Sequence, residues 1–453
     1  MDDSSAPKPK CINKVIFTFF GIASLLGWNA LLTELDFFNF FLSDINPFKS
    51  FPFMNYVLNI TFQFVLLYKK DIFSLFTELM IGIIGSIAFL VVLPLSAMLL
   101  GINTMANKVV TSLLVVLMGF TNACASGGFF GYAGYFPLEM IVSFTAGQGI
   151  SGIGLNILQF IVIASVKISD VKKQFIVRGW IFFGFSILVL LVCLFLLFYS
   201  YKDEYCKYYL NKGKSPDGVI EKSEAKLLKS MTGDDDNSNN MNEAKNQQIE
   251  TLESDNKRER QNDINTVKVV PSFCYVFRKM WDLEIILCYC YVVTFTLFPN
   301  ASIVQKVFNI GEYNSVTIIA IYNALDTAGR YIVNCLPQNK KLDFGIIIGR
   351  SILIFTIIFN YYCQVKLGTS LTATSILIII YVALLGVTNG IGATLTFGIA
   401  SKNAEDEIKE QVGNSIGFFC ILGIFLGSVL AFGSGAIIEH ITKSAIIKLQ
   451  SYF

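Results

Sequence analysis

The chain has 453 residues, of which 54% are hydrophobic and 15% charged, and its formal net charge is +2. Soluble domains carry roughly 25% charged residues, so this composition excludes an ordinary soluble protein. The near-neutral charge and the lack of a basic face give no indication of a nucleic-acid partner.

Apolar runs of about 20 residues recur along the chain, which is the length that crosses roughly 30 Å of hydrocarbon. In lipid, only a helix satisfies every backbone N–H and C=O within one segment, so these runs predict helices and not strands. Six predicted spans precede a polar stretch and five follow it. They lie near residues 12–33, 53–68, 75–101, 109–136, 141–166, 175–200, 282–300, 315–337, 344–364, 371–400 and 412–438.

The polar stretch, residues 201–272, separates the sixth predicted span from the seventh. It is rich in Asn, Asp, Glu, Lys and Ser and includes the run from Asp234 to Asn240. Such a segment cannot bury enough apolar area to offset the entropy of ordering it, so we predict a disordered cytoplasmic loop. The loop divides an all-α polytopic membrane protein of about eleven spans into a six-helix bundle, residues 1–200, and a five-helix bundle, residues 273–453.

The basic residues of the short loops predict the orientation of the spans. If the N-terminus is cytoplasmic, four basic clusters fall on the cytoplasmic side, whereas acidic residues follow the first span on the outer side. Eleven spans then place the C-terminus outside, and the first helix, which no cleavage site follows, is retained. Basic residues between the fifth and sixth spans are the exception. The clusters are Lys8, Lys10 and Lys14; Lys69 and Lys70; Arg278 and Lys279; Lys340 and Lys341; the acidic residues are Glu34, Asp36 and Asp44; the exception is Lys167, Lys172 and Lys173.

Two charged residues, Asp326 and Arg330, interrupt the apolar run 315–337. A spacing of four places both on one face of a helix, where they can pair. Each costs about 2.5–3.5 kcal/mol at the centre of a membrane-spanning helix, which is usually tolerated where the face lines a polar cavity. Asn323, one turn earlier, adds an amide to the same stripe. The stripe indicates a substrate-facing pair; a structural ion pair that joins two helices is the alternative.

Trp28 and Asn29 lie deep in the first apolar run. A tryptophan alone is more often a packing residue or an interfacial anchor. Together with the polar stripe, it indicates a flat apolar wall opposite hydrogen-bonding groups, which fits a planar heterocycle bearing hydroxyls. Arg350 is left out of the site because it lies near the end of a span, where its side chain can snorkel to the interface. Glu139 is left out because it lies between spans.

Residues suited to catalysis or metal binding are sparse. His440 is the single histidine, and no nucleophile–base pair accompanies it, so an enzyme is not expected. The ten cysteines are scattered, mostly within apolar runs, as is typical of small buried hydrophobes. Cys288 and Cys290 are too close together for a zinc site. No glycine-rich phosphate loop indicates an ATPase. We therefore expect no catalytic residue, no metal and no cofactor.

Several segments, taken in chain order, resemble motifs of the equilibrative nucleoside transporter family. The segment Tyr322–Arg330 is close to the family's eighth-helix signature and is the most specific of them. Gly27 precedes Trp28 and Asn29 where the family motif has proline. The resemblance covers essentially the whole chain outside the polar loop. The other matching segments are Phe129–Gly134, Gly147–Gly152, Phe298–Pro299 and Gly386–Gly390.

The resemblance implies a fold similar to the major facilitator class, with two bundles rocking around a central site. It also implies facilitative transport of nucleosides or nucleobases by alternating access. Carried over by position, Trp28 stacks on or caps the substrate, and Asp326 and Arg330 bond its sugar hydroxyls or base edge. The remaining expected site residues are Leu32, Ser126, Phe298, Ile319 and Asn323.

Two of these positions depart from the family pattern. Leu32 stands where many relatives have methionine, and Ser126 where several have a glutamine that contacts the base. Because a hydroxyl cannot make two bonds to a base edge, the preferred base is not predicted. Gly147 and Gly152 are interpreted as helix-packing positions.

Other transport and binding functions remain open alternatives. One is a proton-coupled carrier of the same substrates through Asp326, although the expected bond to Arg330 argues against it. Others are a carrier of this architecture for a sugar or an amino acid, and a non-transporting nucleoside-binding membrane receptor. The expected partners are the small-molecule substrate and the lipid bilayer, with no nucleic acid and no obligate protein partner. The expected location is the plasma membrane.

Overall fold

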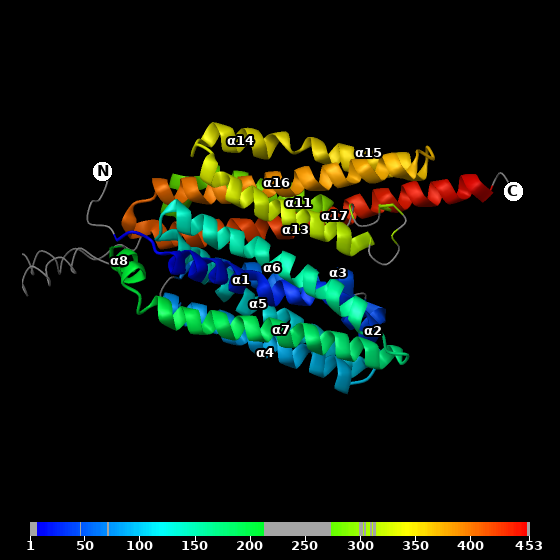
Figure 1. The fold of residues 1–453 in the computed structure, drawn as a ribbon, viewed down its shortest axis with the longest axis horizontal. Coiled ribbons are helices and arrows are strands. Elements are labelled where there is room, and N and C mark those ends of the chain that lie inside the picture. The colour runs from blue at the N-terminus through cyan, green and yellow to red at the C-terminus, as the bar shows by residue number, and fades with distance from the viewer. Residues whose placement is uncertain are drawn as a thin grey trace, which may run out of the picture.

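The computed structural model describes residues 7–45, 47–69, 72–212, 273–298 and 314–450, together with residues 302, 305–308 and 310. Within these residues the chain forms long helices, and no strand occurs among them. The helices run side by side along the longest axis of the molecule, and α1 begins at the opposite end of the assembly from the end of α17 (Figure 1).

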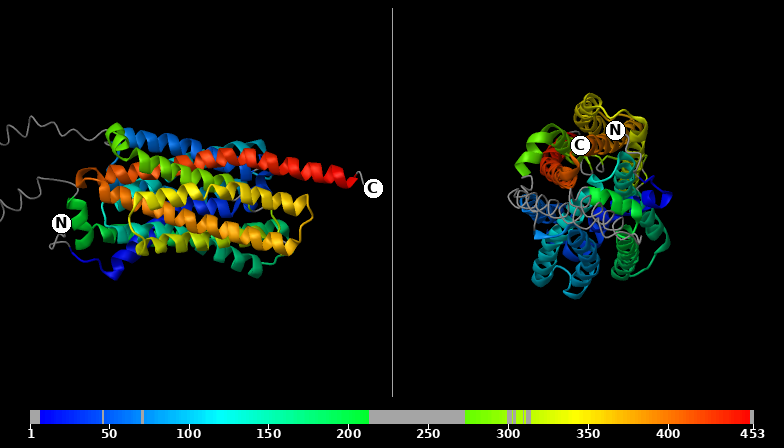
Figure 2. Two further views of the ribbon diagram at one scale, coloured as in Figure 1. Left: turned by 90° about the horizontal axis from the view of Figure 1, so that it is seen from above. Right: turned by 90° about the vertical axis from the view of Figure 1, so that its left-hand side faces the viewer.

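The helices before the polar loop make up the first half of the protein. α1 to α7 include the first six predicted spans, with an extra short helix, α2, after the first span. In the end-on view of Figure 2 these helices lie together on one side of the molecule. Their bounds are α1 Cys11–Thr33, α2 Leu35–Leu42, α3 Pro47–Tyr68, α4 Leu75–Leu99, α5 Met105–Gly134, α6 Leu138–Ser165, α7 Val171–Ser200 and α8 Glu204–Lys212.

The helices after the loop make up the second half. The third of its predicted spans consists of two helices, α14 and α15, which are separated at Arg350 and Ser351. The bounds of the second-half helices are α11 Phe273–Leu297, α13 Asn314–Ile332, α14 Lys340–Gly349, α15 Ile352–Val365, α16 Leu371–Asn403 and α17 Lys409–Gln450.

Ten candidate spans in the described part of the chain are long and apolar enough to cross a membrane. The predicted span absent from this count is α13, whose 19 residues include Asn323, Asp326 and Arg330. α13 is long enough to span a membrane, so its polar composition is what excludes it from the count. It packs between α6 and α16. The chain is therefore an integral, multi-pass membrane protein, and its most polar membrane helix is sheltered by its neighbours.

Helix starts follow capping residues more closely than they follow hydropathy. The side chain of Thr104 accepts a hydrogen bond from the backbone N–H of Asn107, so α5 begins four residues before the predicted 109. Asp170 caps Lys173 in the same way, and α7 begins at Val171 and not at 175. Ser, Thr and Asp satisfy N–H groups that a helix leaves unpaired at its start. Capped first turns therefore extend these helices beyond their apolar cores.

The predicted loop begins too early in the sequence. Residues 204–212 form α8, in which Tyr205, Cys206 and Leu210 are buried. The side-chain amide of Asn13 on α1 also donates to Asp203 Oδ2 at 2.8 Å. The predicted loop start at residue 201 was wrong. The three buried side chains lie on one face of α8 and pack it against the end of the first half. The remainder of the predicted loop, residues 213–272, lies outside the described residues.

Glycines allow helices to approach closely at several crossings. A Cβ at Gly147 of α6 would overlap the carbonyl oxygen of Thr18 on α1, and a Cβ at Gly390 of α16 would overlap that of Asp326 on α13. The predicted packing role of Gly147 is confirmed. Gly152 packs against the side-chain amide of Asn323, so it also lies at a helix crossing, between the two halves. Small residues at such crossings let backbones meet in lipid, where no hydrophobic effect drives helices together.

Candidate functional site

The charged pair of α13 lies inside the protein. Arg330 Nε donates to Asp326 Oδ2 at 2.8 Å, and each residue is only 4% exposed. The i, i+4 spacing therefore forms the expected ion pair. Burying two charges is costly unless further hydrogen bonds satisfy the remaining donors and acceptors, so the surroundings of the pair decide what it can do.

Arg330 also joins the two halves of the protein. Its Nη1 donates to the carbonyl oxygen of Thr145 at 2.8 Å and to Gln148 Oε1 at 3.0 Å, both on α6. Gln148 Nε2 in turn donates to Ser24 Oγ on α1 at 3.2 Å. The second terminal nitrogen of the guanidinium, Nη2, makes no hydrogen bond to the residues that the structure describes. One arginine thus links both halves and retains donors for a further partner.

Asp326 has a second partner on α16. Asn389 Nδ2 donates to Asp326 Oδ1 at 2.7 Å, while Arg330 holds the other carboxylate oxygen. An ionised carboxylate offers about four lone-pair positions. The described contacts use two of them, so Asp326 keeps acceptor capacity on both oxygens.

A second buried arginine, Arg350, reaches the same group of residues. We expected it to snorkel to the membrane surface, but that prediction is wrong: Arg350 is 3% exposed. Its guanidinium turns inward at the break between α14 and α15, where neighbouring helices offer it four acceptors. These are Cys290 Sγ at 2.8 Å, Asn389 Oδ1 at 3.2 Å, Thr294 Oγ1 at 2.7 Å and the carbonyl oxygen of Leu385 at 3.1 Å.

Aromatic side chains supply flat apolar surfaces in both halves. Trp28 of α1 meets Tyr56 of α3 edge-on, with ring centroids 4.9 Å apart. Phe298 stacks on Tyr322 of α13 at 4.1 Å with an interplanar angle of 19°. Tyr322 lies one helical turn before Asp326 on α13. The aromatic pair in the second half therefore adjoins the charged pair.

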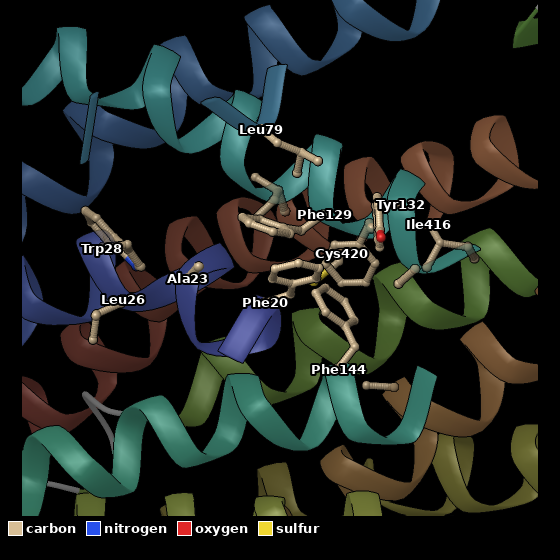
Figure 3. Close-up of a cluster of buried hydrophobic side chains, with 14 of the residues drawn as sticks. Phe20, Ala23, Leu26, Trp28, Leu79, Phe129, Tyr132, Phe144, Ile416 and Cys420 are labelled. Atoms are coloured by element: carbon tan, nitrogen blue, oxygen red, sulfur yellow. The ribbon is translucent and has the colours of Figure 1, made fainter. Parts of the chain in front are cut away.

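Trp28 lies apart from the cluster of aromatic rings around Phe20 in the first half. Figure 3 shows Phe20, Phe129 and Tyr132 gathered together, with Trp28 further along α1. The ring centroids of Phe20 and Phe129 are 5.2 Å apart, and those of Phe20 and Tyr132 are 5.4 Å apart. These rings fill the first half toward the start of α1, whereas Trp28 lies nearer its end.

The other predicted site residues lie in three different places. Ile319 and Asn323 are half-buried on the same helix as the charged pair, and Ile319 packs against the cluster that contains Phe298. Leu32 is half-buried near the end of α1. Ser126 belongs to a different group of contacts: it accepts a hydrogen bond from Gln63 Nε2 of α3 and donates to the carbonyl oxygen of Asn122. No described hydrogen bond joins Ser126 to the network around Asp326.

Four polar residues of these networks were missed as site residues: Gln63, Gln148, Asn389 and Arg350. Gln148 and Asn389 lie in the segments Gly147–Gly152 and Gly386–Gly390, of which only the glycines were interpreted from the sequence. A side-chain amide within an apolar run long enough to span the membrane could have identified both residues, because polar residues inside membrane helices are rare and usually functional. Gln63 gave a similar signal near the end of its span.

Residues 112–434 match the family model described as nucleoside transporter. The chain belongs to the nucleoside transporter family. Equilibrative nucleotide transporter 7 of Arabidopsis thaliana is 25% identical over 447 residues, covering 95% of this chain and 96% of the relative. Equilibrative nucleoside transporter 2 of Mus musculus is 24% identical and covers 92% of this chain and 95% of its own length. The resemblance expected from the motifs is confirmed.

Solved structures show that this nucleoside transporter family member has a major facilitator fold. The proton:xylose symporter XylE matches with a TM-score of 0.58 at 14% identity, covering 97% of this chain and 95% of that one. The fucose:proton symporter FucP of E. coli matches with a TM-score of 0.51 at 10% identity, covering 96% and 98%. The predicted fold class is confirmed, and the family and fold together support a transporter and not an enzyme.

Proposed function

We propose that this protein carries nucleosides, or their free bases, passively across a membrane by alternating access. The observation that supports it most is the buried Asp326–Arg330 pair, which contacts α6 of the first half and keeps unused hydrogen-bonding capacity. Unused donors and acceptors on the pair leave capacity for a ligand, which a pair satisfied entirely by protein would lack. Membership of the nucleoside transporter family supports the same conclusion.

The proposed site combines polar recognition with flat apolar walls. Free lone pairs on the Asp326 carboxylate accept substrate hydroxyls, and Arg330 Nη2 donates to an oxygen or ring nitrogen. The Trp28 ring covers one face of the base, and Phe298 with its stacked neighbour Tyr322 flanks the charged pair. Apolar walls with a few placed polar groups are the usual composition of small-molecule sites.

Four further residues complete the proposed site. Leu32 and Ile319 add apolar contacts, and Asn323 adds an amide on the helix of the charged pair. Ser126 stands further off, and we propose that its partner Gln63 supplies the amide that a serine lacks for contact with a base. In this proposal the α3–α5 crossing determines which base is preferred, and α13 binds the substrate hydroxyls.

Alternating access follows from the contacts between the halves. We take the helices of the two halves, α1 to α8 and α11 to α17, as the two moving bundles. The bonds from Arg330 to Thr145 and Gln148 join them at the charged pair, while Gly149 allows α6 to approach Thr327 of α13. Rocking of the bundles breaks and reforms these contacts. Because Arg330 also binds substrate in this proposal, occupancy of the site and movement of the bundles are coupled.

The plasma membrane, with a cytoplasmic N-terminus and an outer C-terminus, is the location we propose. The basic residues of the short loops support this orientation. The opposite positions of the start of α1 and the end of α17 fit an odd number of spans. Surface labelling of an epitope added after Phe453, without permeabilising the cells, tests it: labelling is expected, and labelling only after permeabilisation would reverse the orientation.

Uptake of labelled adenosine by cells lacking their own nucleoside carriers tests the function. We expect saturable uptake that stops when inside and outside concentrations are equal, and that competes with uridine or hypoxanthine but not with glucose. Competition by glucose would favour a sugar carrier. Accumulation beyond equality that collapses with the proton gradient would favour the proton-coupled alternative, and binding without flux would favour a receptor.

A further inference from the structure

Arg350 is a buried cation whose described hydrogen-bond partners are all neutral groups. Among the described residues it makes no salt bridge, and its four hydrogen bonds go to a thiol, an amide, a hydroxyl and a backbone carbonyl. A buried arginine is costly in a membrane, and neutral acceptors compensate it less than a carboxylate would. The described hydrogen bonds connect Arg350 to the carboxylate of Asp326 through Asn389.

The side-chain amide of Asn389 connects Arg350 to Asp326 through hydrogen bonds. Its Oδ1 accepts from Arg350 Nη1 at 3.2 Å and from Thr294 Oγ1 at 2.7 Å, and its Nδ2 donates to Asp326 Oδ1 at 2.7 Å. The two ends of an asparagine amide are nearly the same in shape, so the amide can turn over unless its partners distinguish them. Turned over, its oxygen would face the Asp326 carboxylate and repel it. Three donors on the other side, Arg350, Thr294 and the Cys290 thiol at 3.7 Å, prevent this.

We propose that Arg350 is a positioning residue of the transport site, acting through Asn389 to hold the Asp326 carboxylate in the orientation that accepts a substrate hydroxyl. This inference rests on the proposed function, because it takes Asp326 as a substrate-binding group. Arg350 never touches the substrate. It fixes the Asn389 amide, the amide fixes Asp326 Oδ1, and Arg330 fixes Oδ2.

The arrangement requires an arginine and not just a positive charge. The two terminal nitrogens of Arg350 reach four acceptors on α11 and α16 at once, from the break between α14 and α15. A lysine carries a compact ammonium with three donors on a flexible stem, so it cannot reproduce this planar fork. Arg350→Lys should therefore retain the charge and lose most of the positioning.

The test measures adenosine binding to purified protein together with transport KM, for Arg350→Gln, Asn389→Ala and the double variant. Each single change is expected to raise the adenosine Kd about tenfold, equivalent to about 1.4 kcal/mol. The double variant is expected to match the single ones, because both break one chain of contacts. Additive losses in the double variant would overturn the proposal.

Deoxy analogues separate positioning from a general loss of structure. Among 2′-, 3′- and 5′-deoxyadenosine, the analogue lacking the hydroxyl bound by Asp326 should bind wild-type protein weakly and be unaffected by Arg350→Gln. A change that only loosened the fold would weaken all analogues alike, and this outcome would contradict the proposal. An unchanged adenosine Kd in folded Arg350→Gln protein would contradict it too.

Thr294→Val is the second route if Arg350→Gln fails to fold. It removes the hydroxyl that donates to Asn389 Oδ1 and accepts from Arg350 Nη2, with little change in shape, and should raise the Kd a few-fold with the same hydroxyl selectivity. A wild-type Kd in this folded variant, together with a wild-type Kd in Arg350→Lys, would overturn the inference. If wild-type protein neither binds nor transports adenosine, the proposed function is wrong, and this inference, which rests on it, is wrong too.

Discussion

At the scale of residues, the buried charges of the site are stabilised by hydrogen-bond partners that lie far away in the sequence. Asp326 and Arg330 could be predicted as a pair because both lie on one face of a single helix. Their partners Gln148 and Asn389 come from α6 and α16, and no local pattern connects positions so distant. Arg350 was misjudged for the same reason: its acceptors lie on other helices, so its place near a span end was misleading.

Asp326→Asn should cut adenosine uptake at least a hundredfold without blocking membrane insertion. The substitution removes the charge that faces Arg330, and an unpaired buried arginine costs about 3–5 kcal/mol. Uptake rate per surface-labelled molecule measures it. Glu139→Gln is the matched control, because the Glu139 side chain is 59% exposed in its pair with Lys14 and such pairs contribute little. Normal uptake by Asp326→Asn would remove α13 from the site.

Glu34, which lies just outside the first membrane span, should make the thermal stability of the protein depend on pH. Burial, reinforced by the charge of Asp36 and opposed by Arg178, raises the Glu34 pKa to about 8. A carboxyl with a raised pKa contributes stability at pH below its usual value of 4.5, and this contribution is lost as pH rises through 8. Glu34→Gln should therefore match wild-type thermal stability at pH 5 and exceed it at pH 9. Equal stability at both values would show that Glu34 is not buried in the folded state.

At the scale of elements, helix crossings explain what hydropathy alone could not. The spans were predictable because about 20 apolar residues are needed to cross a bilayer. α2 and α8 were not, because each is too short to carry a spanning signal and is held by contacts of buried side chains. Phe37, Phe38 and Phe41 of α2 are fully buried, which no pattern in a loop of that length predicted.

Gly147→Ala and Gly154→Ala on α6 should differ sharply in thermal stability. A Cβ at Gly147 overlaps the Thr18 carbonyl oxygen on α1, so the two helices must separate; overpacking of this kind costs about 1–3 kcal/mol or more. A Cβ at Gly154 meets nothing within 4 Å, so alanine there should be neutral or stabilise slightly. Thermal unfolding of the purified variants measures both, and equal melting temperatures would contradict the close α1–α6 crossing.

The boundary between α8 and the predicted loop makes two deletions informative. Removing residues 217–263 should leave uptake largely intact, because so polar a segment has little apolar area to pack. Extending the deletion back to residue 204 should lower surface delivery and uptake strongly, because it removes the buried side chains of α8. Both are read as uptake per delivered molecule. Loss of uptake in the shorter deletion, with normal delivery, would make the loop part of the transport machinery.

At the scale of the whole molecule, two halves meet along α5–α17 and α6–α13 and share one buried polar network. The eleven-span order and the family motifs made the fold predictable from sequence. The network was predictable only in part, because it consists of single polar residues contributed by α1, α6, α11, α13, α16 and the α14–α15 break. Each such residue looks alike in sequence, whether it binds substrate, joins helices or positions another side chain.

Counterflow in sealed proteoliposomes tests the central claim most directly. Vesicles loaded with unlabelled adenosine, with no proton or ion gradient, are diluted into a trace of labelled adenosine. A passive alternating-access carrier predicts that label accumulates transiently above its outside concentration and then falls back, and that Asp326→Asn abolishes the overshoot. No overshoot from functionally reconstituted wild-type protein, or an overshoot that requires a proton gradient, would contradict passive carriage.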